Sequence, residues 1–321
     1  MTRPAPPSKL AQMADDKKTT ERGHPRRYAI GATAVDVSPL AAGLYLVATP
    51  IGNLRDVTLR ALETLAAADV IACEDSRVTR KLTEHYGVAT PLTPYHEHNA
   101  AEARPKLIAR LARGEAVALV SDAGTPLISD PGYKLVRAAS EAGHAVMAVP
   151  GASAVLTALT TSGLPTDRFF FEGFLPPKPA ARQKRITALA AVPATLVLFE
   201  SGPRLAAALA DLAAGLGARD AAIGRELTKL HEEMRRGSLG ELARHYAGGG
   251  ETRGELVIVV APPADEPASA IDIDAMLRDA LNRVSVKDAV GEVASATGRP
   301  RREVYQRALA LAKDDDDGPP Q

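Results

Sequence analysis

Three mostly apolar segments of this chain each end in a short turn that could hold a ligand. The segments cover residues 44–49, 117–121 and 145–149. The turns after them contain Pro50 and Gly52; Asp122, Ala123, Gly124 and Thr125; and Pro150, Gly151, Ala152 and Ser153. Glycine lets the backbone approach a ligand without an intervening Cβ. Ligands of open α/β sheets bind at the carboxyl ends of strands, so we expect one ligand to lie across these turns.

The turns lack the phosphate-binding patterns of two common nucleotide sites. None of them reads G-x-G-x-x-G, and none reads G-x-x-x-x-G-K-[ST]. The first absence argues against a nicotinamide dehydrogenase, and the second argues against a P-loop enzyme.

An acidic group follows another apolar segment, residues 70–73. Glu74 and Asp75 stand just before Arg77, and carboxylates beside an arginine at a strand end could accept a proton or hold polar groups of a substrate. The alternative is structural: Asp75 caps a helix that begins near Arg77, and Glu74 forms a surface ion pair.

The loop at residues 95–99 carries two histidines with a glutamate between them. The helical H-E-x-x-H pattern is absent and no third ligand stands nearby, so we predict no metal. His96 and Asn99 are instead candidates for a substrate-binding or active-site loop, with a plain solvated loop as the alternative.

Strands and helices alternate from residue 44 to residue 162. This order predicts a mostly parallel sheet covered on both faces. The predicted strands are 44–49, 70–73, 117–121 and 145–149, and the predicted helices are 58–68, 77–86, 100–113, 133–142 and 153–162.

A second α/β unit and a helical tail follow. The predicted strands of the second α/β unit are 169–171, 195–199, 221–226 and 255–260, and its predicted helices are 183–190, 204–214 and 238–245. A proline-rich linker at 262–267 precedes predicted helices at 275–283, 286–297 and 301–312. The fold class is therefore α/β, with a disordered extension (1–40), two α/β domains (41–163 and 164–261), a helical appendix (268–313) and an acidic tail (314–321).

Composition narrows the class of protein. The chain has 321 residues, which suggests about two domains. Cys73 is the only cysteine, which excludes an internal disulfide and suits a reducing cytoplasm. No apolar run approaches the ~18 residues of a membrane span, and residues 1–30 lack the apolar core of a secretory signal. We therefore expect a cytoplasmic protein with no membrane association.

Two basic clusters could bind phosphates of a nucleic acid, although the formal net charge is zero. One comprises Lys178, Arg182, Lys184 and Arg185, and the other comprises Arg299, Arg301 and Arg302. The second cluster stands at the start of the last predicted helix, where the helix dipole disfavours cations unless an anion is near. The alternative for the first cluster is a solvated helix face, and the alternative for the second is a surface arrangement of charges without a function.

Seven motifs now resemble a known family in content and in order. They are LYLVATPIGNLRDVTLRALETL, IACEDSRVTRKL, SDAGTPLISDPG, VPGASAV, FFFEGFLP, LVLFESGPRL and RELTKLHEE. They resemble the tetrapyrrole-methylase-like family, and within it the branch that methylates a cytidine ribose 2′-hydroxyl in the decoding region of bacterial 16S ribosomal RNA. The similarity covers roughly residues 44–260, and the C-terminal helices resemble the helix-turn-helix appendix of that branch.

The resemblance implies a homodimer whose two α/β domains hold S-adenosylmethionine in a cleft, with 16S rRNA or the small ribosomal subunit as substrate. It assigns methyl-donor contacts to the three turns and, in the second domain, to Phe199, Glu200, Gly254 and Leu256. Two other functions stay open: a small-molecule methylase of the same fold acting on a porphyrin-like ring, and a DNA-binding regulator.

Overall fold

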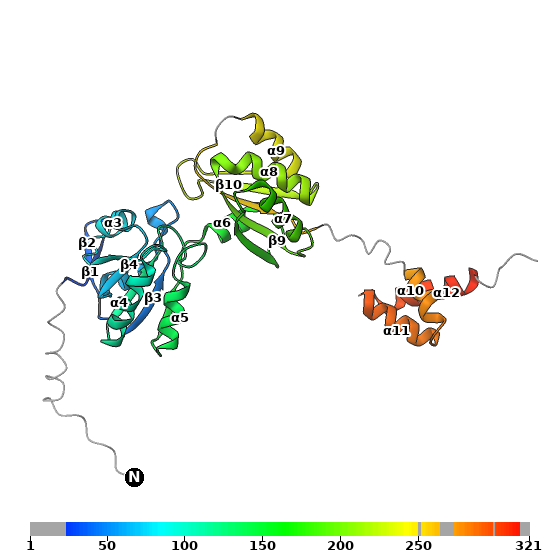
Figure 1. Cartoon of the computed structure of the whole chain (residues 1–321), viewed down its shortest axis with the longest axis horizontal. Helices are drawn as coiled ribbons and strands as arrows, with labels where there is room; N and C mark the ends of the chain where they lie inside the picture. The colour runs from blue at the N-terminus through cyan, green and yellow to red at the C-terminus, as the bar shows by residue number, and fades with distance from the viewer. Residues whose placement is uncertain (1–23, 250–251, 264–272, 298, 315–321) are drawn as a thin grey trace, which may run out of the picture. The chain divides into compact units, whose positions relative to one another are not determined.

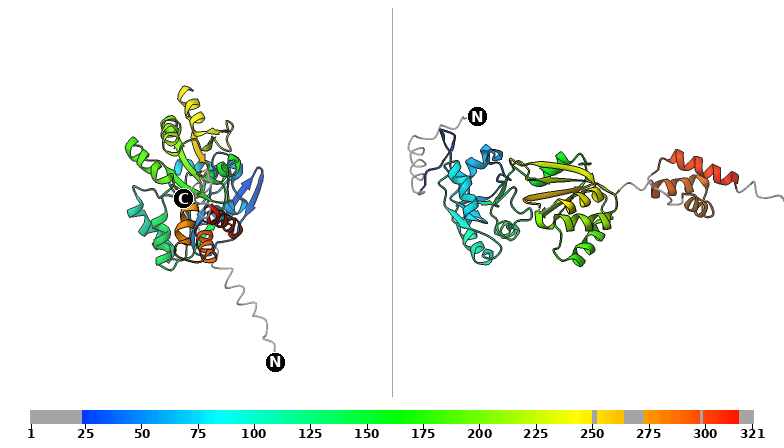
Figure 2. Two further views of the ribbon diagram at one scale, coloured as in Figure 1. Left: turned by 90° about the vertical axis from the view of Figure 1, so that its right-hand side faces the viewer. Right: turned by 90° about the horizontal axis from the view of Figure 1, so that it is seen from above.

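The computed structural model describes residues 24–249, 252–263, 273–297 and 299–314. The chain divides into two compact units, Met1–Ala261 and Pro262–Gln321, and each is considered by itself. The first unit contains two five-stranded sheets with helices packed on them, and the second is helical (Figure 1, Figure 2).

The first sheet is fully parallel, with strand order β5-β4-β6-β3-β7. Its strands are β3 (Gly43–Val47), β4 (Val70–Cys73), β5 (Leu92–Pro94), β6 (Ala116–Val120) and β7 (Val146–Val149). Its helices are α2 (Leu59–Ala67), α3 (Ser76–His85), α4 (Ala100–Ala112) and α5 (Tyr133–Glu141). The four strands and the four helices predicted here are confirmed, whereas β5 was not predicted because it is only three residues long.

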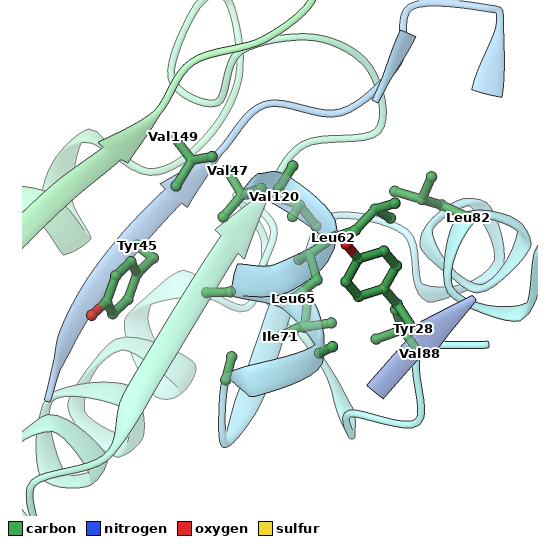
Figure 3. Close-up of a cluster of buried hydrophobic side chains, with 14 of the residues drawn as sticks. Tyr28, Tyr45, Val47, Leu62, Leu65, Ile71, Leu82, Val88, Val120 and Val149 are labelled. Atoms are coloured by element: carbon green, nitrogen blue, oxygen red, sulfur yellow. The ribbon is translucent and has the colours of Figure 1, made fainter. Parts of the chain in front are cut away.

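Helices cover both faces of this sheet, as the alternation predicts. Ile71 faces a core that includes Leu62 and Leu65 of α2 (Figure 3). Val70, on the opposite face of the same strand, packs in a second core with side chains from α4 and α5. Both faces of the central strands are therefore buried, which is typical of a parallel sheet.

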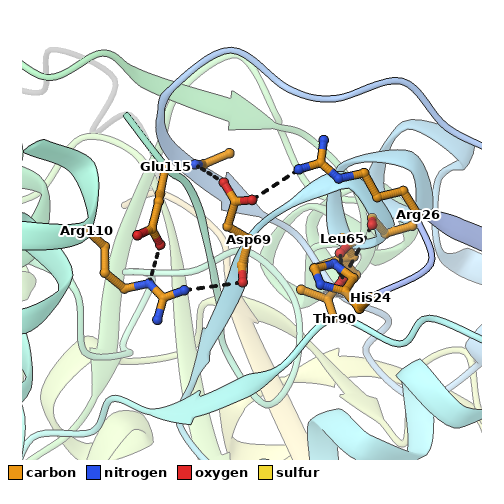
Figure 4. A network of polar contacts seen from close by, with 9 residues as sticks. His24, Arg26, Leu65, Asp69, Thr90, Arg110 and Glu115 are labelled. Atoms are coloured by element: carbon orange, nitrogen blue, oxygen red, sulfur yellow. Dashed lines mark hydrogen bonds and ion pairs between the residues drawn. The ribbon is translucent and has the colours of Figure 1, made fainter. Parts of the chain in front are cut away.

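A β-hairpin precedes the first sheet and corrects one prediction. Strands β1 (Arg27–Ile30) and β2 (Thr33–Asp36) pair antiparallel. Tyr28 is buried in the α2 core (Figure 3). The Arg26 guanidinium lies 3.1 Å from the Asp69 carboxylate (Figure 4). The expectation that residues 1–40 form a disordered extension is therefore wrong for the hairpin, because the domain supplies the core that this polar segment lacks; residues 1–23 lie outside the described part.

The second sheet is mixed, with strand order β11-β10-β12-β9-β8. Its strands are β8 (Phe169–Phe174), β9 (Thr195–Ser201), β10 (Asp220–Arg225), β11 (Glu233–Ser238) and β12 (Glu255–Val260). Only β8 and β9 pair in parallel; the other neighbours are antiparallel. Helices α7 (Pro179–Leu189), α8 (Gly202–Leu216) and α9 (Leu239–Gly248) pack on one face. Strand β11 was not predicted, because its charged residues mask the apolar alternation of a strand.

Helix α6 (Ala154–Ser162) packs on the other face of the second sheet. Val155 and Leu159 of α6 share a core with Val197 of β9 and Val257 of β12. The predicted domain boundary at residue 163 is therefore wrong: the helix belongs by packing to the second domain. Ser153 caps this helix as predicted, since its hydroxyl accepts a hydrogen bond from the Leu156 N–H at 3.4 Å.

The second unit consists of α10 (Ile273–Leu281), α11 (Val286–Thr297) and α12 (Arg301–Asp314), in agreement with the three predicted helices. Leu277, Val293 and Val304, one from each helix, lie in a core of its own. Residues 315–321 of the predicted acidic tail lie outside the described part. Among the described helices of the chain, none combines the length and the apolar composition needed to cross a membrane.

Candidate functional site

A cavity of about 350 Å³ lies in the first unit, where the turns after β3, β6 and β7 meet the end of β9 and the start of β12. This volume falls within the range of small-molecule sites. Most of the predicted methyl-donor contacts line it: Asp122, Ala123, Gly124, Thr125, Ser153, Phe199, Glu200, Gly254 and Leu256. The cavity thus brings together strand ends that the sequence predicted separately.

Backbone hydrogen bonds fix two of the turns against each other. The Thr49 N–H donates to the Gly124 carbonyl at 2.9 Å, and the Gly124 N–H donates to the Thr49 carbonyl at 3.1 Å. Gly124 has a φ of +78°, and a Cβ there would lie 3.3 Å from Cγ2 of Ile51. Glycine is therefore required at this point of the cavity wall.

The remaining predicted contacts do not line the cavity. Pro50, Gly52, Pro150, Gly151 and Ala152 are not among the described residues that line the cavity. Ala152 supports the wall, because its carbonyl accepts a hydrogen bond from the Thr125 hydroxyl at 3.4 Å. A Cβ on Gly151 would lie 3.0 Å from Cβ of Ala48, so this glycine allows close packing of two loops.

Lys229 lines the cavity and was missed by sequence reasoning. Its side chain lies over Gly52, where a Cβ would come within 2.4 Å of Lys229 Cγ. Its ammonium lies 3.0 Å from Glu226 Oε1 and 2.9 Å from Glu255 Oε2. Burial opposes this charge, but the two hydrogen bonds outweigh it and raise the pKa of Lys229. The contact joins loops about 180 residues apart, so no local pattern indicates it.

Two carboxylates give one part of the cavity a negative character. Asp122 and Asp130 both line it, and burial raises the pKa of each. Asp122 Oδ1 accepts a hydrogen bond from the Asp75 N–H at 3.0 Å, which partly offsets the effect of burial. Burial is the main cause of both pKa shifts, and no ion pair within 4.0 Å is found for either carboxylate among the described residues, so this part of the cavity suits a cationic ligand.

The acidic group at the end of β4 divides into two roles. Asp75 caps α3 and accepts hydrogen bonds from Arg77, at 2.8 Å from its N–H and 2.6 Å from Nη2. These bonds lower the pKa of Asp75 to about 2, which makes it a poor proton acceptor at neutral pH. The cap and the ion pair agree with the structural alternative for Asp75, and a role of Asp75 and Arg77 in holding substrate groups stays a prediction. Burial, and then the nearby Asp122 and Asp130, raise the pKa of Glu74.

His96 and Asn99 follow β5, and the loop that carries them lies beside the end of β4. Asn99 braces this loop: its Oδ1 accepts from the His96 N–H at 2.9 Å, and its Nδ2 donates to the Pro94 carbonyl at 3.0 Å. Neither residue is among those described as lining the cavity. No cluster of three or more potential metal ligands is found among the described residues.

The first basic cluster is only partly available to RNA. Arg182 is buried, with Nε 2.6 Å from Asp211 Oδ2, so its prediction as a phosphate contact is wrong. Arg185 pairs in bidentate fashion with Glu172, at 2.6 Å for both hydrogen bonds. The side chain of Lys178 is exposed at the N-cap of α7, and that of Lys184 is exposed in the middle of this helix.

In the second unit, the other basic cluster stands at the start of α12. Arg299 Nη1 lies 2.6 Å from Glu303 Oε1. Arg301 and Arg302 are exposed in the first turn, where the helix dipole favours an anion.

Comparison with known proteins identifies the class. Residues 43–243 match the family of tetrapyrrole (corrin/porphyrin) methylases, and residues 267–312 match the RsmI C-terminal HTH domain. The chain belongs to the tetrapyrrole methylase family and is a methyltransferase, which confirms the resemblance found in the sequence.

The similar proteins of known name share one description. A Mesorhizobium japonicum protein named ribosomal RNA small subunit methyltransferase I is 55% identical over 286 residues, covering 88% of this chain and 96% of the relative. Its namesake from a Synechocystis strain is 47% identical and covers 84% of this chain and 99% of the relative.

Solved structures support the fold alone. Diphthine synthase superposes with a TM-score of 0.53 at 19% identity, covering 68% of this chain and 89% of that one. A conserved hypothetical protein from Aeropyrum pernix gives 0.53 at 21% identity, covering 88% and 100%.

Proposed function

We propose that this chain transfers a methyl group from S-adenosylmethionine to the ribose 2′-hydroxyl of a cytidine in the decoding region of 16S rRNA. The observation that carries the proposal is the cavity, with the turns after β3, β6 and β7 on one side and the ends of β9 and β12 on the other. The shared name of relatives that align over nearly the whole chain supports rRNA as the substrate.

The residues of the cavity fit the methyl donor. When bound, S-adenosylmethionine supplies a methyl group activated by a positively charged sulfur. Asp122 and Asp130 provide the negative charge that a sulfonium and an ammonium group favour. Phe199 and Leu256 provide an apolar wall for the flat ring of the donor. Gly124 has no side chain, so the donor can approach its backbone closely.

The chain's main task is to orient the acceptor hydroxyl, and positioning of this kind can contribute about 7–11 kcal/mol. A ribose hydroxyl must also lose a proton. Within the acidic group at residues 74–77, Glu74 is the candidate proton acceptor, because its raised pKa is closer to neutral pH than that of an ordinary carboxyl group. His96, on the neighbouring loop, is the second candidate.

Exposed cations fit the RNA backbone. In this proposal Lys178 and Lys184 of the first unit contact phosphates, and Arg301 and Arg302 of the second unit do the same. We also propose that the enzyme works as a homodimer in the cytoplasm. Exposed apolar side chains on the first unit, such as Phe170 and Leu156, offer area for contact between two copies.

The test is transfer of labelled methyl groups from S-adenosylmethionine to small ribosomal subunits from a strain that lacks this enzyme. Nuclease mapping should place the label on a ribose 2′-oxygen of a 16S cytidine. Label on a base, or transfer only to a porphyrin-like ring, would refute the assigned acceptor. Sequence-specific duplex DNA binding without any methyl transfer would indicate a regulator instead.

A further inference from the structure

Strand β8 contains an irregularity that changes the direction of one aromatic side chain. Phe171 pairs with Val197 of β9, but Gly173 already pairs with Leu198 and Phe174 with Phe199, so Glu172 is an extra residue. A β-bulge of this kind re-aims side chains and is frequent beside active sites.

The bulge puts Phe174 on the cavity side of the sheet. Val197 lies in the core beneath α6 and Leu198 in the opposite core, so successive residues alternate between the two faces. Regular alternation would send Phe174 to the face opposite Phe171, because a shift of one residue reverses every side chain. Gly173, with a φ of +76°, supplies the left-handed conformation that restores Phe174 to the face of Phe171 and Phe199.

Phe174 is both exposed and held in place. It lines the cavity, yet 53% of the residue is accessible to solvent. Its ring meets Phe199 edge to face, with centroids 5.6 Å apart, and Phe199 meets Phe171 in the same way at 5.0 Å. The bracing fixes the orientation of the ring, so an exposed flat apolar surface is available at the edge of the cavity.

Cations follow this ring closely along the chain. Lys178 stands four residues after Phe174, so the backbone between them spans at most about 14 Å. Lys178 is exposed at the N-cap of α7, where the helix dipole adds positive potential, and Lys184 is exposed further along the same helix. Proteins that bind single-stranded nucleic acids combine such aromatic surfaces with a basic groove.

We propose that Phe174 is a positioning residue on which the base of the target nucleotide stacks after it leaves its neighbours in the RNA. Stacking there holds the attached ribose at the cavity while the phosphates lie toward Lys178. The inference rests on the proposed RNA methyl transfer and adds to it the residue that receives the base.

The test compares three full-length variants: Phe174→Ala, Phe174→Tyr and Phe169→Ala. Phe169 is the matched control, because it lies on the same strand, is 44% exposed and is not among the described cavity residues. The probe is a 16S rRNA fragment with a fluorescent cytosine analogue at the mapped position. Measurements are RNA affinity, fluorescence change on binding, kcat/KM for RNA, and calorimetric affinity for S-adenosylhomocysteine.

Phe174→Ala should lower RNA affinity and kcat/KM on the order of 10-fold to 100-fold, because one stacked base contributes about that much. It should abolish the fluorescence change and leave the affinity for S-adenosylhomocysteine intact. Phe174→Tyr, which keeps a ring, and Phe169→Ala should behave like the unsubstituted chain.

Three results would overturn the inference: equal effects of Phe174→Ala and Phe169→Ala on RNA binding, a parallel loss of S-adenosylhomocysteine affinity, or dissociation of a dimer by Phe174→Ala. The first result would show that the Phe174 ring has no special role in RNA binding. The second would show that the ring contacts the methyl donor, and the third would show that it belongs to a protein interface. Failure of the unsubstituted chain to methylate RNA would refute the proposed function as well, whereas normal methylation by Phe174→Ala refutes only the role of the ring.

Discussion

Replacing Gly202 by alanine should damage the cavity without touching any residue that lines it. Gly202 begins α8, and the backbone of residues 252–253 crosses directly over it. A Cβ at this position would lie 1.9 Å from the carbonyl oxygen of Thr252 and 2.7 Å from its carbonyl carbon. A Cβ essentially never comes within 3.0 Å of another non-bonded heavy atom. Helix α8 and the crossing segment must therefore separate by about 1.1 Å, and the close-packed interior transmits this strain to neighbouring residues.

The displacement should reach catalysis because Gly254, two residues beyond Thr252, forms part of the cavity wall. Overpacking of this kind costs about 1–3 kcal/mol, which for a unit of this size lowers the melting temperature by about 2–12 °C. A misplacement of about 1 Å near reacting groups can lower a rate on the order of a hundredfold. We therefore expect Gly202→Ala to keep its fold and to lose most of its methylation rate.

The assay combines initial rates on small ribosomal subunits with thermal unfolding and calorimetric titration of S-adenosylhomocysteine. Gly215→Ala is the matched control, because it lies in the same helix and its Cβ would lie 2.6 Å from Ile186 Cγ2, in the core of the domain. It should leave the rate and the affinity unchanged. A Gly202→Ala enzyme with the native rate would refute the reasoning, since the crossing segment would then move without disturbing the cavity.

Three further predictions concern charge. Affinity for the cationic methyl donor should fall as the pH drops through the pKa of Asp122, which burial raises above its ordinary 3.8. Asp122→Ala should weaken donor binding at pH 7 and flatten this decline with pH. A calorimetric pH profile that Asp122→Ala leaves unaltered would contradict the assignment. Arg182→Ala should destabilise the first unit by about 1.5–3 kcal/mol, because it removes a charge-assisted hydrogen bond and leaves half-buried Asp211 with Gln183 in place of the ion pair. A selective loss of RNA affinity at constant stability would argue otherwise. The double variant Arg301→Ala, Arg302→Ala should reduce the salt dependence of RNA binding while donor affinity stays constant, and an unchanged salt slope would remove these residues from the interface.

The strand ends were predictable because their signal is local. An apolar run followed by Asp122 and Gly124 specifies a strand and a turn within a few residues, and parallel strands bring such turns to one edge of a sheet. The family resemblance added the second-domain contacts, Phe199 and Gly254, which no local pattern marks.

What could not be predicted depends on distant partners. Arg182 has the composition of a phosphate ligand, and only the position of Asp211 on α8 makes it a buried structural residue. Lys229 lines the cavity and packs over Gly52, which follows a strand of the other sheet of the first unit. Tyr28 becomes ordered because α2 offers it an apolar surface, although its own segment is polar.

The antiparallel pairing of β9 and β12 ties the chemistry of this protein to the length of its strands. Phe199 pairs with Val257 and faces the cavity, while Leu198 pairs with Ile258 and faces the hydrophobic core under α7, α8 and α9. Adding or removing a single residue in either strand would move the side chains of each face to the other face. Aliphatic core residues would then meet the ligand, and the Phe199 ring would be buried in the core. Natural length variation should therefore accumulate in loops remote from the cavity, such as the 217–219 connection before β10, and be absent from these two strands.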